Sequence, residues 1–216
     1  MIEKYLQHEA ERKAQGIPAK PLESGQVVEL CRLLEDPPEG KAAFLLHLFR
    51  ERIAPGVDPA AEVKAAFLSG IISGSARSPL ISRQEAVRLL GTTLGGYNVA
   101  PLIAALSDAE LADEAADALS GTILMYDAFD EVLDLSRTNA AAKRVVESWA
   151  DAEWFSGRQE LPETIKVKVF KVEGEINTDD FSPAGDAWSR PDIPLHALSM
   201  GKSRFPGALE TIARFR

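Results

Sequence analysis

The residues best suited to chemistry lie in one polar loop, residues 176–195, which reads INTDDFSPAGDAWSRPDIPL. Its Asn, Thr, Asp, Ser, Pro and Gly residues bond to their own backbone or restrict its dihedral angles, so we expect an ordered loop without regular structure. Within it, Arg190 follows Ser189 and precedes Pro191. A guanidinium in a rigid loop suits bidentate binding of a carboxylate or a phosphate. The structural alternative is an Arg190 side chain stacked on the indole of Trp188.

The segment before this loop has the alternation of a β-strand. In residues 164–172 the apolar Ile165, Val167 and Val169 alternate with lysines. A period of two predicts a strand with one buried face. One strand, a loop and one or two short helices cannot form a sheet of their own. We therefore expect this part of the chain to be truncated, or completed by packing on the part before it.

The first 156 residues have the apolar spacing of amphipathic helices, beginning with residues 2–15. Three helix starts carry capping signals: Asp58-Pro59, Ser82 with Glu85, and Ser107 with Glu110. Residues 98–119 have the form of a HEAT-type repeat, two helices joined by a short acidic turn. The glycine run GTTLGGYN just before it lacks the Gly-Lys-Ser/Thr ending of a phosphate-binding loop. The sequence predicts stacked helical hairpins.

Composition excludes several classes of protein. The net charge is −9, and no window combines clustered Lys or Arg with aromatics, so bulk electrostatics oppose binding to nucleic acid or anionic membranes. Cys31 is the single cysteine, so the chain can form no internal disulfide and no cysteine-ligated cluster by itself. It falls on the apolar stripe of a helix with Val27, Leu30 and Leu34, which predicts a buried, inert thiol. We expect a cytoplasmic protein with no membrane span.

The run NTDDFSPAGDAWSRPDIPLHAL, preceded by VKVFKVEGE, closely resembles the start of the swivel domain of aconitases of the bacterial aconitase B type. The segments GTTLGGYNVAPLIAAL and ESWADAEWF resemble the same family less specifically. The resemblance implies a mainly α chain: a HEAT-like helical domain over residues 1–156, then the beginning of an α/β swivel domain over residues 157–216. It also implies that Arg190 binds a substrate carboxylate, and that Thr178 and Asp179 line the site or order its loop.

Members of this family interconvert citrate and isocitrate through cis-aconitate, and the bifunctional type also dehydrates 2-methylisocitrate. They use a [4Fe-4S] cluster and a serine base. The resemblance implies that the cluster cysteines and that serine lie beyond residue 216, so we assign no catalytic or metal-binding residue to this chain and expect it to be inactive alone. It further implies a homodimer formed through the helical domain, and leaves a specific messenger RNA open as a partner.

Two functions from different classes remain open at this point. The chain is either the N-terminal region of a hydro-lyase of this family, or a helical-repeat adaptor that binds protein or RNA and has no enzymatic role. The reading frame downstream of Arg216 separates them, because a frame encoding the family's serine loop and cluster cysteines favours the enzyme. The choice between citrate and methylcitrate does not follow from these residues.

Overall fold

The computed structural model describes residues 1–123, 125–187, 189–190, 192–202, 204–205 and 207–214. Over these residues the regular structure consists of α-helices and short 3-10 turns, with no named β-strand. The mainly α class expected from the sequence is confirmed. The described residues divide into two compact units, Lys20–Gln159 together with Met1, and Ile2–Ala19 together with Glu160–Arg216.

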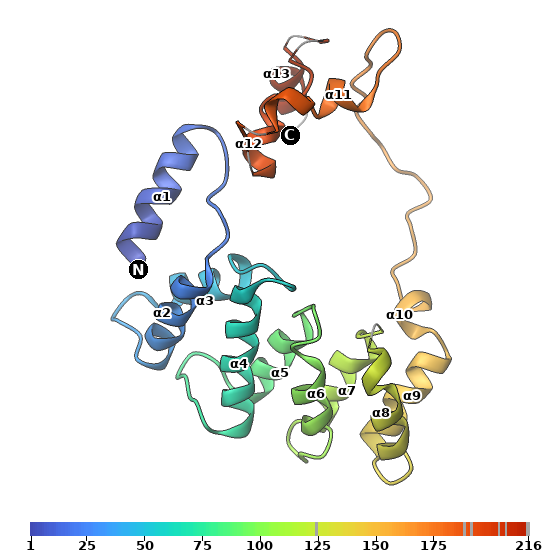
Figure 1. Cartoon of the computed structure of the whole chain (residues 1–216). Helices are drawn as coiled ribbons and strands as arrows, with labels where there is room; N and C mark the ends of the chain where they lie inside the picture. The colour runs from blue at the N-terminus through green and yellow to red at the C-terminus, as the bar shows by residue number, and fades with distance from the viewer. Residues whose placement is uncertain (124, 188, 191, 203, 206, 215–216) are drawn as a thin grey trace. The chain divides into compact units, whose positions relative to one another are not determined.

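The first unit is a succession of paired helices (Figure 1). They are α2 (Ser24–Glu35), α3 (Ala42–Glu51), α4 (Pro59–Ser73), α5 (Arg83–Gly91), α6 (Val99–Ala105), α7 (Ala112–Ser120), α8 (Phe129–Leu135), α9 (Ala140–Ala150) and α10 (Glu153–Ser156), with the 3-10 turn η1 (Tyr126–Ala128) before α8. One layer runs α2, α4, α5, α7, α9, each packed on the next. The other layer holds α3, α6 and α8, which pack on α2, α7 and α9 respectively. The first unit is thus a stack of helices in two layers, in which each element packs mainly on its neighbours in the stack.

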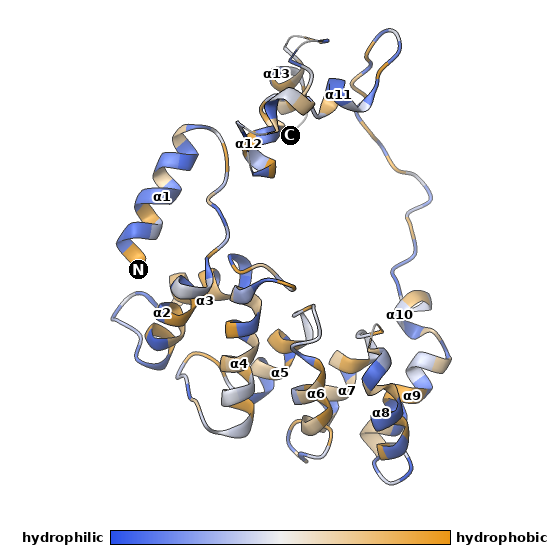
Figure 2. Ribbon diagram, viewed as in Figure 1, coloured by the Kyte–Doolittle hydropathy of each residue, from blue (hydrophilic) through white to orange (hydrophobic). Residues whose placement is uncertain are grey.

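The core of the first unit lies between these layers and consists of aliphatic side chains. Its fully buried large members are Leu30, Leu34, Leu45, Leu48, Phe49, Leu68, Leu90, Leu102, Leu106, Leu111 and Leu119. Figure 2 shows that the helices carry both hydrophobic and hydrophilic residues, as expected of helices that bury one face. Each hairpin therefore covers the apolar face of its neighbour, and burial of this face is the main force that holds the stack together.

Local signals explain where several of these helices begin and end. The Asp58 carboxylate accepts a hydrogen bond from the Ala60 amide, and Pro59 occupies the first helical position of α4. The helix ends at Gly74 with φ of 82°, in the left-handed region that glycine adopts without strain. The Ser82 hydroxyl accepts a hydrogen bond from the Glu85 amide at the start of α5. Both starts confirm the sequence prediction.

The predicted capping box at Ser107 and Glu110 is wrong. Helix α7 begins later, at Ala112, and residues 107–111 form a turn. The Asp108 carboxylate accepts the Glu110 amide, and the Arg83 guanidinium forms ion pairs with both Asp108 and Glu110. One of these contacts lies within the acidic turn and the other two come from Arg83 of α5, so the turn is held in place ahead of α7.

The glycine run between α5 and α6 has a packing role. The Leu94 amide donates a hydrogen bond to the Pro55 carbonyl oxygen at 2.5 Å. Gly95 has φ of 81°, and a Cβ atom at this position would lie 2.7 Å from the Val57 amide nitrogen. Glycine is therefore required here by a close approach of two loops.

The second unit contains α1 (Ile2–Ala14), α11 (Thr178–Phe181), the 3-10 turn η2 (Ala184–Asp186), α12 (Ile193–Ala197) and α13 (Ala208–Ala213). Helix α1 thus groups with the C-terminal residues, whereas the division expected from the sequence places residues 2–15 in the helical domain.

The strand predicted over residues 164–172 is wrong for this structure. The segment has no regular structure, and the side chains of Ile165, Val167 and Val169 are 62%, 73% and 74% exposed. A strand requires a partner for its backbone hydrogen bonds, and no described residue pairs with this segment. The alternating pattern is therefore present in the sequence without the neighbouring strand that would bury its apolar face.

Candidate functional site

The polar loop singled out from the sequence is ordered by short helices and their caps. The Asn177 side chain accepts a hydrogen bond from the Asp180 amide at 3.1 Å, and the Asp180 carboxylate accepts the Asn177 amide at 2.9 Å. This reciprocal capping box starts α11. The Asp192 side chain accepts the Leu195 amide at 3.0 Å and starts α12, with Pro194 within its first turn. Both ends of the loop are therefore fixed by side chains within it.

Aromatic packing and a glycine attach this loop to the residues that follow it. The Phe181 and Phe205 rings lie with centroids 5.6 Å apart, and Phe170 contacts Phe205 at 6.0 Å. The Gly201 amide donates to the Asp180 carbonyl oxygen at 2.8 Å. Gly201 has φ of 70°, and a Cβ atom there would lie 2.2 Å from the Phe205 ring. A side chain at position 201 would displace the ring on which α11 packs.

The structure places Arg190 between η2 and α12. Its amide donates to the Asp186 carbonyl oxygen at 3.0 Å, and its guanidinium Nη1 donates to the Leu195 carbonyl oxygen at 3.3 Å. The side chain is half-buried. Among the described residues no carboxylate forms an ion pair with it, although a guanidinium has five donors. Trp188 and Pro191, which lie on either side of the Ser189-Arg190 pair in the sequence, are outside the described residues.

Thr178 and Asp179 occupy the first two positions of α11, and both are exposed. The Thr178 carbonyl oxygen accepts the Ser182 amide at 2.8 Å. No hydrogen bond or ion pair between described residues joins either of them to Arg190. The three predicted site residues thus belong to one loop, and the hydrogen bonds and ion pairs of its described part do not link Thr178 or Asp179 to Arg190.

Two other groups take part in the loop and were not predicted from the sequence. The Ser182 hydroxyl and His196 Nε2 lie 2.8 Å apart, which links the end of α11 to α12. The Arg12 guanidinium of α1 donates two hydrogen bonds to the Asp192 carboxylate, both at 2.8 Å. That hydrogen bonding raises the pKa of the Arg12 guanidinium above its ordinary value. No sequence motif points to Arg12, because it lies 180 residues from its partner.

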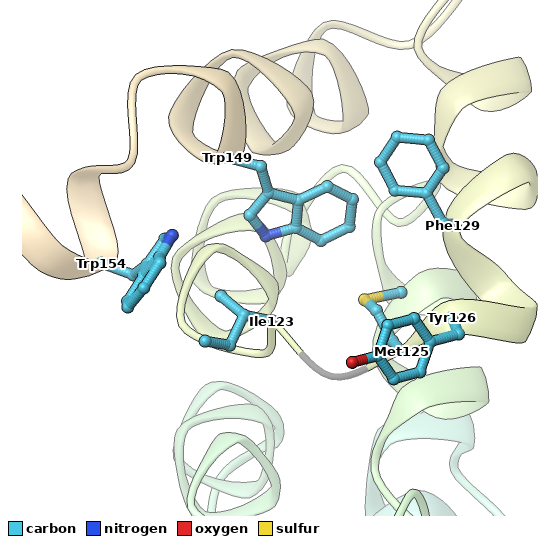
Figure 3. A pocket seen from close by; sticks show the side chains of 6 residues that line it. All are labelled: Ile123, Met125, Tyr126, Phe129, Trp149 and Trp154. Atoms are coloured by element: carbon cyan, nitrogen blue, oxygen red, sulfur yellow. The ribbon is translucent and has the colours of Figure 1, made fainter.

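A second candidate site is an apolar pocket of about 490 Å³ in the first unit (Figure 3). Its lining residues are Ile123, Met125, Tyr126, Phe129, Trp149 and Trp154. The Phe129 and Trp149 rings stack with centroids 5.7 Å apart, and the Trp149 indole donates to the Leu119 carbonyl oxygen at 3.1 Å. Among the described residues the lining includes no carboxylate, imidazole or amine, so these residues can bind apolar groups but offer no acid or base for catalysis.

Cys31 lies in α2 and is buried, as predicted. Burial, aided by the nearby Glu35 charge, raises the pKa of its thiol to about 12, so it is protonated and unreactive near neutral pH. Among the described residues no group of three or more His, Cys, Asp and Glu side chains could hold a metal ion. None of the described helices has both the length and the apolar character needed to cross a membrane.

The amino-acid sequence matches models of known protein families and individual known proteins over both compact units. Residues 4–155 match the family model described as the aconitate B N-terminal domain, and residues 167–216 match the aconitate hydratase 2 N-terminus. The chain is 56% identical to aconitate hydratase B of Escherichia coli over 208 residues, which cover 96% of this chain and 24% of that protein. The corresponding protein of Helicobacter pylori is 49% identical over 205 residues, 94% of this chain and 24% of its own length.

The curated relatives are thus about four times as long as this chain, which spans about a quarter of their length. The match extends through both compact units and through the loop that carries Arg190. The chain therefore belongs to the aconitase B family and corresponds to its N-terminal region.

Proposed function

We propose that this chain is the N-terminal region of a hydro-lyase that interconverts citrate and isocitrate through cis-aconitate, with dehydration of 2-methylisocitrate left open as a second activity. The observation that carries the proposal is identity of 56% to aconitate hydratase B across 96% of the chain. The division into a HEAT-like domain over residues 1–156 and the start of a swivel domain over residues 157–216 belongs to the same proposal. The compact units depart from that division at one place, since Ile2–Ala19 group with Glu160–Arg216.

In this proposal Arg190 binds a carboxylate of the substrate. It is half-buried and has no carboxylate partner among the described residues, while its Nη1 is oriented by the Leu195 carbonyl. A guanidinium that is held in position without a carboxylate partner is suited to an anionic ligand. Its planar group can donate two parallel hydrogen bonds to that ligand. Thr178 and Asp179, at the exposed start of α11, contribute to the same face of the site or keep the loop ordered.

The proposed reaction requires a [4Fe-4S] cluster that acts as a Lewis acid on the substrate hydroxyl. Such clusters are held by several cysteine thiolates. The residues of this chain do not fit that group, because Cys31 is its only cysteine and lies buried as a protonated thiol. We therefore assign substrate binding, and no step of bond breaking, to these 216 residues.

The remaining parts of the proposal concern partners. Helical stacks present extended surfaces to other macromolecules, so we propose that the first unit mediates homodimer formation. A specific messenger RNA remains a second proposed partner, and the cytoplasm the proposed compartment. The apolar pocket around Trp149 favours the adaptor function as a second candidate, because exposed aromatic groups such as Tyr126, at 81% exposure, are common at protein interfaces.

The test is Arg190→Lys in the full-length enzyme, which keeps the charge and removes the fork. We expect KM for isocitrate to rise by about 5- to 150-fold, equivalent to about 1–3 kcal/mol, because hydrogen bonds to a charged partner are lost. The melting temperature should change little. The matched control is Arg204→Lys, because Arg204 donates to the Glu175 carbonyl oxygen and holds the backbone. A melting-temperature drop with normal KM in Arg190→Lys would remove Arg190 from the site.

A further inference from the structure

The ion pair between Arg12 and Asp192 joins helix α1 to the loop that carries Arg190. The Arg12 side chain is only 8% exposed, and its two Nη atoms each lie 2.8 Å from an Asp192 carboxylate oxygen. Its Nε donates to the Pro18 carbonyl oxygen at 2.9 Å. The chain brings Pro18 to this position by turning at Gly16, where the Ile17 amide donates to the Arg12 carbonyl oxygen. The guanidinium plane is therefore fixed from two sides.

Asp192 transmits this constraint to α12. The same carboxylate that receives Arg12 also accepts the Leu195 amide, and the Asp192 carbonyl oxygen accepts the His196 amide at 2.8 Å. These are the bonds that start the helix. A neutral Asn or Ser could cap the helix equally well. The carboxylate, unlike those side chains, offers a charged pair of oxygens to the bidentate contact with Arg12.

This series of contacts ends at Arg190, the residue proposed to bind the substrate carboxylate. The Leu195 carbonyl oxygen, at the beginning of α12, accepts the hydrogen bond from Arg190 Nη1. Arg12, Asp192, the first turn of α12 and Arg190 thus form a continuous series of hydrogen bonds within one compact unit. Among the described residues, the Leu195 carbonyl is the group that orients the Arg190 guanidinium. A shift of α12 would therefore move this carbonyl and with it the guanidinium.

We propose that Arg12 is a positioning residue for substrate binding: through Asp192 it fixes the start of α12 and thereby the direction of the Arg190 guanidinium. This inference rests on the proposed function of Arg190. It gives helix α1 a defined role in the enzyme, because α1 supplies the fork that fixes the site loop. Arg12 does not itself touch the substrate and acts only through Arg190.

The experiment compares Arg12→Lys, Asp192→Asn and Lys13→Gln in the full-length enzyme. Lysine keeps the charge but cannot form the bidentate contact, and asparagine keeps the cap on Leu195 but not the ion pair. Both should raise KM for isocitrate by about 10-fold with a smaller change in kcat, since misplacement of a binding group by about 1 Å costs up to ~100-fold. Lys13 is exposed and adjacent to Arg12, so Lys13→Gln should behave as wild type.

Two further measurements separate positioning from a general structural role. Arg12→Lys combined with Arg190→Lys should raise KM no more than Arg190→Lys alone, because Arg12 acts through Arg190. In hydrogen exchange, both Arg12→Lys and Asp192→Asn should speed exchange of the amides of residues 195–198, with the amides of α4 unchanged.

The outcomes distinguish the two proposals. If Arg190→Lys leaves KM unchanged, the proposed function of Arg190 is overturned, whatever the Arg12 variants do. If Arg190→Lys raises KM while Arg12→Lys and Asp192→Asn change neither KM nor exchange at residues 195–198, only the positioning role is overturned. Additive increases in the double variant would also overturn it, because Arg12 would then act independently of Arg190.

Discussion

The two compact units are stabilised in different ways. In the first unit, consecutive helices bury aliphatic side chains between two layers, and many leucines, such as Leu68 and Leu119, are fully inaccessible. In the second unit the apolar residues of the extended segment remain exposed, including Val167 at 73% and Val169 at 74%. Its order comes from caps, the Phe170, Phe181 and Phe205 cluster, and the Arg12 ion pair.

The two units differ in whether their elements can satisfy their own backbone hydrogen bonds. A helix satisfies its backbone hydrogen bonds within itself, so a stack of helices needs only a neighbour to cover each apolar face. A strand must obtain its hydrogen bonds from another strand. The first unit therefore contains the neighbouring helices that its apolar faces require. Among the described residues, the extended segment of the second unit has no partner strand. The site loop that follows this segment depends on polar contacts from α1.

The largest expected effect is a contrast in hydrogen exchange between the units. Amides of α4 and α7 should exchange only through global unfolding of the first unit, with protection of about 10⁴-fold or more for an ordinary domain. Amides of residues 164–172 should exchange near the rate of an unstructured peptide, because they have no partner strand among the described residues. Segment-resolved mass spectrometry of the 216-residue chain measures both. Equal protection in the two segments would contradict this account of the difference.

A smaller effect is expected when a buried leucine is replaced, compared with an exposed one, and it concerns the free energy of unfolding. Leu68→Ala in α4 should destabilise the first unit by about 2–5 kcal/mol, because it removes buried methyl groups and leaves a cavity. Leu161, which is 83% exposed, provides the matched control, and Leu161→Ala should change stability by less than about 0.5 kcal/mol. Urea unfolding followed by helical circular dichroism measures both variants. A loss of similar size in the two would mean that Leu161 is covered in solution.

Most of the helical unit could be predicted from the sequence because its signals are local. The Asp58-Pro59 start of α4 and the apolar stripe of α2 involve residues within one or two turns of each other. The same type of signal failed at Ser107 and Glu110, where Arg83, 25 residues from Asp108, holds the acidic turn. A capping motif does not report such a contact from an earlier helix.

The candidate site was predictable only in part, for the same reason. The Asn177 to Leu195 loop was recognisable as ordered from its residue types, and its position in the family followed from its motif. The strand before it was not confirmed, since alternation in residues 164–172 specifies a face to be buried but not the strand that buries it. Arg12 carried no signal, because its partner lies 180 residues away and a helix with one more arginine looks ordinary.

The smallest expected effect comes from removing an asparagine cap, and each unit offers one for comparison. Asn139 accepts the Ala142 amide at the start of α9 and also donates to the Leu106 carbonyl oxygen at 2.8 Å. Because α9 packs on α7 and α8, Asn139→Ala should lower the unfolding free energy of the first unit by about 1 kcal/mol. Asn139→Ser keeps a capping oxygen and loses the donor to Leu106, so its effect should be smaller.

The equivalent change in the second unit should be visible only locally. Asn177 caps α11, a helix of four residues in a loop that can open without unfolding the helical stack. Asn177→Ala should therefore leave the urea midpoint of the first unit unchanged, while exchange of the amides of residues 180–182 becomes faster. If Asn177→Ala instead lowered the urea midpoint as much as Asn139→Ala, the two units would unfold as one cooperative body. They would then not differ in stability.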